Sequence, residues 1–108
     1  MSLATAIEEK IASKKVIMYS KTTCPYCLKA KKVFSKFITE GTLKKGDYEV
    51  IEIDRDPKCT AIQTCMLKKT GARTVPRVFI NGKFFGGGDE TVQMASNGKL
   101  KKLLNEGC

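Results

Sequence analysis

Residues 16–27 begin with Val16-Ile17-Met18-Tyr19 and end with Cys24-Pro25-Tyr26-Cys27. The first run is continuously apolar, which is typical of a β-strand buried on both faces. Proline is favoured at the first position of a helix, so Pro25 predicts a helix start with Cys24 as its N-cap. The unpaired N–H groups of Tyr26 and Cys27 would then point toward the Cys24 sulfur and favour its thiolate form. Two cysteines at this spacing are typical of thiol–disulfide chemistry.

The helix that begins at Pro25 is predicted to run to about Thr39. Its apolar residues recur at spacings of three and four, which indicates one face packed on a core; they are Ala30, Val33, Phe34, Phe37 and Ile38. A shorter helix is predicted at residues 3–12 and a second strand at residues 48–53. Asp56-Pro57 would start the next helix and Gly71 would end it near Thr70.

Asn81-Gly82 lies between two further apolar runs at residues 77–80 and 83–85, which is a strong hairpin signal. Helical segments are predicted from Asp89 to the break at residues 97–98, and again at residues 99–104. This order predicts an α/β fold with a four-stranded mixed sheet (β-α-β-α-β-β-α) flanked by helices. The first two strands would be parallel, and the hairpin would add an antiparallel edge. Cys24 would lie at the carboxyl end of the first strand, where such sheets build their sites.

The composition limits the chemistry that this chain can perform. Its 108 residues suit a single domain over residues 1–108. It has five cysteines and no histidine, which excludes histidine-based acid–base catalysis and mixed Cys/His zinc sites. Cys59 and Cys65 would project from different sides of one helix, so no metal site is expected there. Cys65 is expected in the core, Cys59 near a helix start, and Cys108 only as an incidental thiol.

The formal net charge of +9 attracts anions, whether nucleic acids, acidic proteins or small anionic substrates. The basic residues are not interleaved with aromatic ones, so we expect no nucleic-acid partner. No apolar run is long enough to cross a membrane, and no membrane partner is expected. The first 15 residues contain Glu8 and Glu9 and do not resemble a leader peptide, so we expect a cytoplasmic protein.

Two further motifs occur between residues 74 and 90. Thr74-Val75-Pro76 precedes the hairpin, and its proline could simply start a strand in the trans form that most such bonds adopt. The glycines at residues 86–88 would let another chain approach the backbone closely, and the helix start after them could hold an anion. A capped loop is the simpler alternative for this motif. Lys21 and Gln63 would by themselves be interpreted as surface residues.

Together these motifs resemble those of the dithiol glutaredoxins. The resemblance rests on four segments in the family's order and spacing, namely residues 21–27, Gln63, residues 70–80 and Gly86-Gly87. It implies a thioredoxin fold, glutathione as co-substrate, and reduction of protein–glutathione mixed disulfides and protein disulfides. Cys24 would be the nucleophile and Cys27 the resolving thiol. Thioredoxins usually carry Trp-Cys-Gly-Pro-Cys, whereas this chain has no tryptophan.

The resemblance also implies the glutathione contacts. Val75 would offer its backbone to the cysteine portion, next to Pro76 in the family's cis form. Lys21 and Gln63 would bind the glycyl carboxylate. The complete expected set is Lys21, Tyr26, Gln63, Thr74, Val75, Pro76, Gly87, Gly88, Asp89 and Glu90. The last four would hold the γ-glutamyl end, and because Glu90 stands where the family has Asp, either Asp89 or Glu90 could contact the ammonium group.

The implied partners are glutathione and proteins that carry a glutathione mixed disulfide or an internal disulfide. Glutathione reductase and NADPH would act indirectly through oxidised glutathione, in a role in electron transport and cell redox homeostasis. We expect a monomer without a metal. One alternative is a carrier that holds an iron–sulfur cluster between two protomers, although the family motif for that role lacks a proline after the first cysteine. A basic nucleic-acid binder is the remaining alternative.

Overall fold

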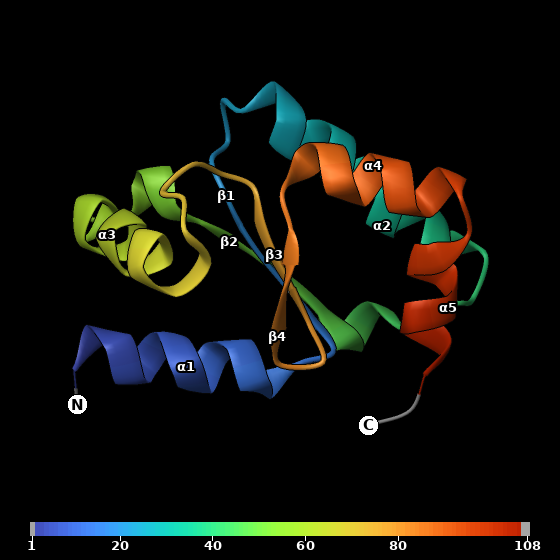
Figure 1. The fold of residues 1–108 in the computed structure, drawn as a ribbon, viewed down its shortest axis with the longest axis horizontal. Helices are drawn as coiled ribbons and strands as arrows, with labels where there is room; N and C mark the ends of the chain where they lie inside the picture. The colour runs from blue at the N-terminus through green and yellow to red at the C-terminus, as the bar shows by residue number, and fades with distance from the viewer. Residues whose placement is uncertain (1, 107–108) are drawn as a thin grey trace.

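The computed structural model describes residues 2–106, and Cys108 therefore lies outside the described residues. The chain alternates between strands and helices (Figure 1): α1 (Leu3–Ser13), β1 (Val16–Ser20), α2 (Pro25–Thr39), β2 (Tyr48–Glu52), α3 (Cys59–Thr70), β3 (Arg77–Ile80), β4 (Lys83–Gly86), α4 (Gly88–Ser96) and α5 (Lys99–Asn105). Short 3₁₀ turns precede and follow β2 at Lys45–Asp47 and Ile53–Arg55. No helix within residues 2–106 has both the length and the apolar character needed to span a membrane.

The four strands form one mixed sheet in the order β2-β1-β3-β4. Strands β1 and β2 are parallel, with Val16 opposite Tyr48 and Ser20 opposite Glu52. Strand β3 runs antiparallel to β1 and forms a hairpin with β4. All five residues of β1 are buried, which confirms the predicted two-sided burial. The predicted topology is thereby confirmed.

Helices cover both faces of the sheet (Figure 1), and the alternation of side chains along β1 divides the core between them. Val16 and Met18 pack in one cluster with Phe34 of α2 and with the buried leucines of α5. Ile17 and Tyr19 pack in the other cluster with residues of α1 and α3. Helix α2 therefore lies on the Val16/Met18 face of the sheet.

Helix α2 begins and packs as its sequence predicts. Cys24 is its N-cap, in an extended conformation, and Pro25 occupies the first helical position. The predicted apolar stripe faces the core, with Ala30, Phe34 and Phe37 buried. The chain thus leaves the buried end of β1, turns through four residues and enters α2 with a cysteine at the turn.

The start of helix α3 differs from the prediction, which placed it at Asp56-Pro57. The helix begins at Cys59, with Lys58 as its N-cap and no side-chain cap. Asp56 instead closes a local turn, in which its Oδ1 atom accepts the Lys58 N–H at 2.8 Å. The Cys59 N–H donates to the Asp56 carbonyl at 3.0 Å, and the first helical bond runs from the Ile62 N–H to the Lys58 carbonyl, so residues 56–59 form a turn ahead of the helix. The predicted end is confirmed, because Gly71 stops the helix with φ at +86°.

Candidate active site

The first residues of α2 place two thiols in different environments. The Cys24 Sγ atom accepts a hydrogen bond from the Cys27 N–H at 3.2 Å. The Tyr26 N–H was expected to be a second donor to the Cys24 sulfur. In the described chain it makes no hydrogen bond to that sulfur. Cys24 is partly exposed, whereas Cys27 has 0 % exposure, and both thiols are free. An outside molecule can therefore reach the Cys24 sulfur, while the Cys27 sulfur is sheltered.

Burial raises the pKa of the Cys27 thiol from 9.0 to about 11, and its hydrogen bond with Cys24 acts in the same direction. Weaker contributions from the Lys21 backbone and the Ser20 side chain lower this pKa. At neutral pH Cys27 is therefore a neutral thiol. It must lose a proton before its sulfur can attack a disulfide.

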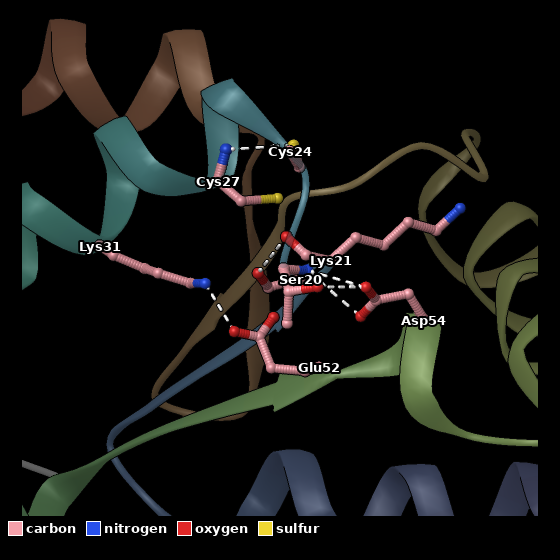
Figure 2. Close-up of polar contacts among 8 residues, drawn as sticks. Ser20, Lys21, Cys24, Cys27, Lys31, Glu52 and Asp54 are labelled. Atoms are coloured by element: carbon pink, nitrogen blue, oxygen red, sulfur yellow. Dashed lines mark hydrogen bonds and ion pairs between the residues drawn. The ribbon is translucent and has the colours of Figure 1, made fainter.

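The turn between β1 and α2 is fixed by Asp54, in the 3₁₀ turn that follows β2. The Thr22 N–H donates to both carboxylate oxygens of Asp54 at 3.2 Å, and the Thr22 hydroxyl donates to one of them (Figure 2). The hydroxyl bond is the largest influence that holds the Asp54 pKa below its usual value. The Cys24 N–H donates to the Lys21 carbonyl at 3.2 Å and closes the turn. These bonds hold Cys24 at the carboxyl end of β1.

The segment before β3 passes beside the Cys24 sulfur. The Val75-Pro76 bond is cis, as the family resemblance implied. The Cys24 thiol donates to the Val75 carbonyl oxygen at an S–O distance of 3.6 Å. An extended peptide that reached the Cys24 sulfur would thus also lie next to the Val75 backbone, where strand-like pairing is available.

The glycine loop at residues 86–88 packs against the start of α2. A Cβ atom on Gly88 would lie 3.1 Å from the Tyr26 Cβ atom, so the close approach depends on glycine. The Gly87 N–H donates to the Glu90 Oε1 atom at 2.6 Å. Asp89 and Glu90 are both exposed, but the Asp89 side chain makes no hydrogen bond within residues 2–106. The two acids at the start of α4 therefore have different roles.

A pocket joins most of the predicted contact residues. Its lining consists of Tyr26, Thr74, Val75, Pro76, Arg77, Gly87, Gly88, Asp89 and Glu90. Sequence reasoning placed all of these in the site except Arg77, which was noted only as part of the family motif. The Arg77 guanidinium donates to the Pro76 carbonyl at 3.1 Å. A basic residue thus lies between the Pro76 segment and the glycine loop.

Lys21 and Gln63 do not line this pocket. Gln63 is on α3, and its Nε2 atom donates to the Arg73 carbonyl at 3.1 Å, which ties the helix to the segment before Thr74. The Lys21 ammonium makes no ion pair with other residues in the range 2–106, and its side chain extends toward α3 in Figure 2. The structure therefore places these two residues on the α3 side of Cys24, away from the glycine loop.

Sequence reasoning missed two polar features near Cys27: the buried Ser20 and the ion pair of Lys31 with Glu52. Ser20 is fully buried at the end of β1, and Glu52 pairs with Lys31 of α2 at 2.6 Å (Figure 2). A signal was present in the sequence, because Glu52 stands between the apolar residues Ile51 and Ile53. The pairing of Glu52 with a helix residue, however, depends on the tertiary fold.

The family model described as Glutaredoxin matches residues 16–85. Glutaredoxin-C6 of Oryza sativa subsp. japonica is 41% identical over 106 residues, which cover 98% of this chain and 88% of the relative. Glutaredoxin-C4 of Arabidopsis thaliana is 44% identical over 101 residues, which cover 94% of this chain and 70% of the relative.

Solved structures show the same similarity. Oxidized glutaredoxin 2 from Chlamydomonas reinhardtii superposes with a TM-score of 0.83 at 51% identity, covering 94% of this chain and 89% of that protein. A buckwheat glutaredoxin–glutathione complex superposes with a TM-score of 0.82 at 37% identity, covering 94% and 86% respectively. The predicted thioredoxin fold is confirmed by this agreement.

Proposed function

This chain belongs to the glutaredoxin family of glutathione-dependent thiol–disulfide oxidoreductases, and from that premise we propose that Cys24 is its nucleophile and Cys27 its resolving thiol. The unequal burial of the two thiols carries the proposal. Cys24 is partly exposed at the helix start, whereas Cys27 has 0 % exposure. The sulfur that can meet an outside disulfide first is therefore that of Cys24.

The proposed substrate is a protein–glutathione mixed disulfide. The Cys24 sulfur attacks the glutathionyl sulfur, the protein thiol leaves, and glutathione stays bonded to Cys24. A second glutathione molecule then releases it, or the Cys27 sulfur displaces it and closes a Cys24–Cys27 disulfide. Glutathione reduces that disulfide, and glutathione reductase with NADPH regenerates the glutathione. A protein disulfide can be reduced by the same two thiols: Cys24 attacks one of its sulfurs, the other leaves as a thiol, and Cys27 then displaces the protein sulfur from Cys24.

The glutathione would lie along the Pro76 segment and the glycine loop. The Val75 backbone beside the Cys24 sulfur suits the cysteine portion of the tripeptide. The start of α4 suits the γ-glutamyl carboxylate, because helix N-termini favour anions. Lys21 and Gln63, on the opposite side of Cys24, suit the glycyl carboxylate. The buckwheat complex supports glutathione as the ligand of this surface.

The experiment is turnover of a glutathionylated peptide in an assay coupled to glutathione reductase and NADPH, with Cys24→Ser, Cys27→Ser and the matched control Cys65→Ser. We expect no turnover with Cys24→Ser and wild-type rates with Cys65→Ser. Cys27→Ser should retain deglutathionylation and lose the reduction of protein disulfides. Turnover by Cys24→Ser, or full dithiol activity in Cys27→Ser, would contradict the assignment.

A further inference from the structure

Of the described residues that line the site pocket, Arg77 alone is basic, and the proposed function gives it no role. Val78 is opposite Gly86 in the pairing of β3 with β4, so Arg77 and Gly87 come next to each other where that pairing ends. A Cβ atom on Gly87 would lie 2.8 Å from the Arg77 Nη2 atom. The guanidinium group therefore reaches the Gly87 backbone, just ahead of the start of α4.

The Arg77 side chain is held in place by its neighbours. Its Nε atom donates to the Pro76 carbonyl at 3.1 Å, and its Nη1 atom donates to the Thr70 hydroxyl at 3.4 Å. Its guanidinium carbon lies 5.1 Å from the centre of the Phe84 ring, which is within the range of a cation–π contact. A side chain that is already fixed in this way loses little further conformational entropy when it binds a ligand.

The Nη2 group of Arg77 is left over by these contacts. It donates no hydrogen bond within residues 2–106, and Arg77 forms no ion pair there. Glu90 also lies beside Gly87, but its Oε1 atom accepts the Gly87 N–H. Partial burial lowers the pKa of the Arg77 guanidinium, while the Glu90 charge acts in the opposite direction. Because arginine stays charged at neutral pH, a cationic donor is available at the edge of the pocket.

This end of the pocket therefore offers charges of both signs. Arg77 supplies a cation beside Gly87, and Asp89 supplies an exposed carboxylate whose oxygens have no hydrogen-bond partner in the described chain. The γ-glutamyl end of glutathione carries an ammonium group and a carboxylate on the same carbon atom, so a site for it needs both signs close together. The glycyl end carries a carboxylate alone. The pair of charges matches the γ-glutamyl end.

We propose that the Nη2 group of Arg77 binds the α-carboxylate of the γ-glutamyl residue, beside the first N–H groups of α4. The inference rests on the proposed function, because it needs glutathione bound along the Pro76 segment and the glycine loop. It makes Arg77 a specificity residue, which distinguishes a γ-glutamyl group with a free α-carboxylate from one in which that carboxylate is blocked.

A purely structural role for Arg77 predicts a different result. Its bond to the Pro76 carbonyl fixes the backbone next to Val75, so the loss of that bond would weaken the reaction with every glutathione-containing substrate alike. A contact between Arg77 and an acidic residue of the substrate protein would likewise not depend on the charges of glutathione. The test must therefore vary glutathione as well as the protein.

The test measures the first step alone, as release of a fluorescent peptide thiol by reduced protein without free glutathione. The peptide is supplied as a mixed disulfide with glutathione, with an analogue whose γ-glutamyl α-carboxylate is an amide, or with an analogue whose glycyl carboxylate is an amide. Arg77→Gln should lower the second-order rate constant about tenfold with glutathione and with the glycyl amide, as for loss of a charged hydrogen bond. With the γ-glutamyl amide it should change the rate constant less than about twofold, because the group that Arg77 binds is then absent.

Two further variants serve as controls. Lys83→Gln removes a positive charge from an exposed position on β4, and it should change each rate constant less than about twofold. Arg77→Lys keeps the charge but lacks the planar fork of donors, so it should lose about threefold, and only on the substrates with a free γ-glutamyl carboxylate. If Arg77→Gln does not fold, the Arg77→Lys comparison decides the question.

Equal losses on all of the substrates in Arg77→Gln would rule out the proposal, and so would an unchanged rate constant with glutathione. Wild-type rate constants for Arg77→Lys on every substrate would also overturn it. Failure of the proposed function gives a different result, because the wild-type protein would then release no peptide thiol from the glutathione mixed disulfide.

Discussion

The Glu90 Oε1 atom accepts the Gly87 N–H at 2.6 Å, so the carboxylate one turn into α4 closes the loop that precedes the helix. The bond is half of a capping box, an arrangement that satisfies a free N–H group at a helix start. Glu90 is therefore occupied by its own chain. Asp89, exposed at the same helix start, remains available to an ammonium group from outside.

Asp89→Asn should raise the KM for glutathione-containing substrates about two- to fivefold with a smaller change in kcat, the size expected for one exposed ion pair. The measurement is steady-state kinetics with a glutathionylated peptide. Asp47→Asn, in the turn before β2, is the matched control and should leave KM unchanged. A larger rise in KM for Glu90→Gln than for Asp89→Asn, in protein of equal thermal stability, would assign the ammonium contact to Glu90 instead.

Gly86→Ala should lower the stability of the protein. A Cβ atom at this position would lie 2.6 Å from the Glu90 Cβ atom and 3.0 Å from its Cγ atom, so the start of α4 would have to move. Overpacking of this kind costs about 1–3 kcal/mol, which chemical denaturation can measure. Gly46→Ala is the control, because nothing lies within 4 Å of its added Cβ atom. Equal unfolding midpoints for the two variants would show that the loop has room.

Cys27 should make the reduced protein less stable at alkaline pH. Its thiol pKa is raised from 9.0 to about 11 in the folded state, so the unfolded chain releases this proton first as pH rises. The contribution to stability is therefore present below about pH 9 and lost toward about pH 11. Urea unfolding under reducing conditions should show a shallower alkaline decline for Cys27→Ala than for wild type. Identical declines would mean that Cys27 ionises alike in both states.

The net charge of +9 should steer anionic substrates toward the protein. The second-order rate constant for a glutathionylated peptide should therefore fall as salt is added at constant pH. The comparison is a neutral disulfide such as hydroxyethyl disulfide, measured for its first reaction with Cys24, whose rate should change much less. Parallel salt profiles for the two substrates would exclude electrostatic steering.

Local signals were sufficient for most of the fold. The apolar run before Cys24, the proline after it and the stripe on α2 each depend on nearby residues, and the structure confirms all three. The start of α3 lies beyond the predicted Asp56-Pro57, because the Cys59 N–H bonds to the Asp56 carbonyl in a turn ahead of the helix. The Asp56 carboxylate bonds to the Lys58 N–H in this turn as it would at a helix N-cap, so this side chain alone does not show where the helix begins.

Site residues that belong to a recognisable motif could be predicted from the sequence. The hydrogen-bond partners of other residues could not, because tertiary contacts decide them. Tyr26 and the glycine loop lie far apart in the sequence and line one pocket, as the family motif implied. The bond of Glu90 to its own loop was not foreseen, since a longer side chain could also have reached outward. The ion pair of Lys31 with Glu52 depends on how α2 packs on the sheet, which only the assembled fold defines.

The most direct test of the account is to trap the intermediate. Cys27→Ser protein is mixed with a glutathionylated peptide without free glutathione, digested under acidic conditions, and analysed by peptide mass spectrometry. The account predicts one glutathione per protein, bonded to Cys24, with the peptide released as a thiol. Glutathione on Cys59 or Cys65 instead, or peptide release without an adduct at Cys24, would contradict it.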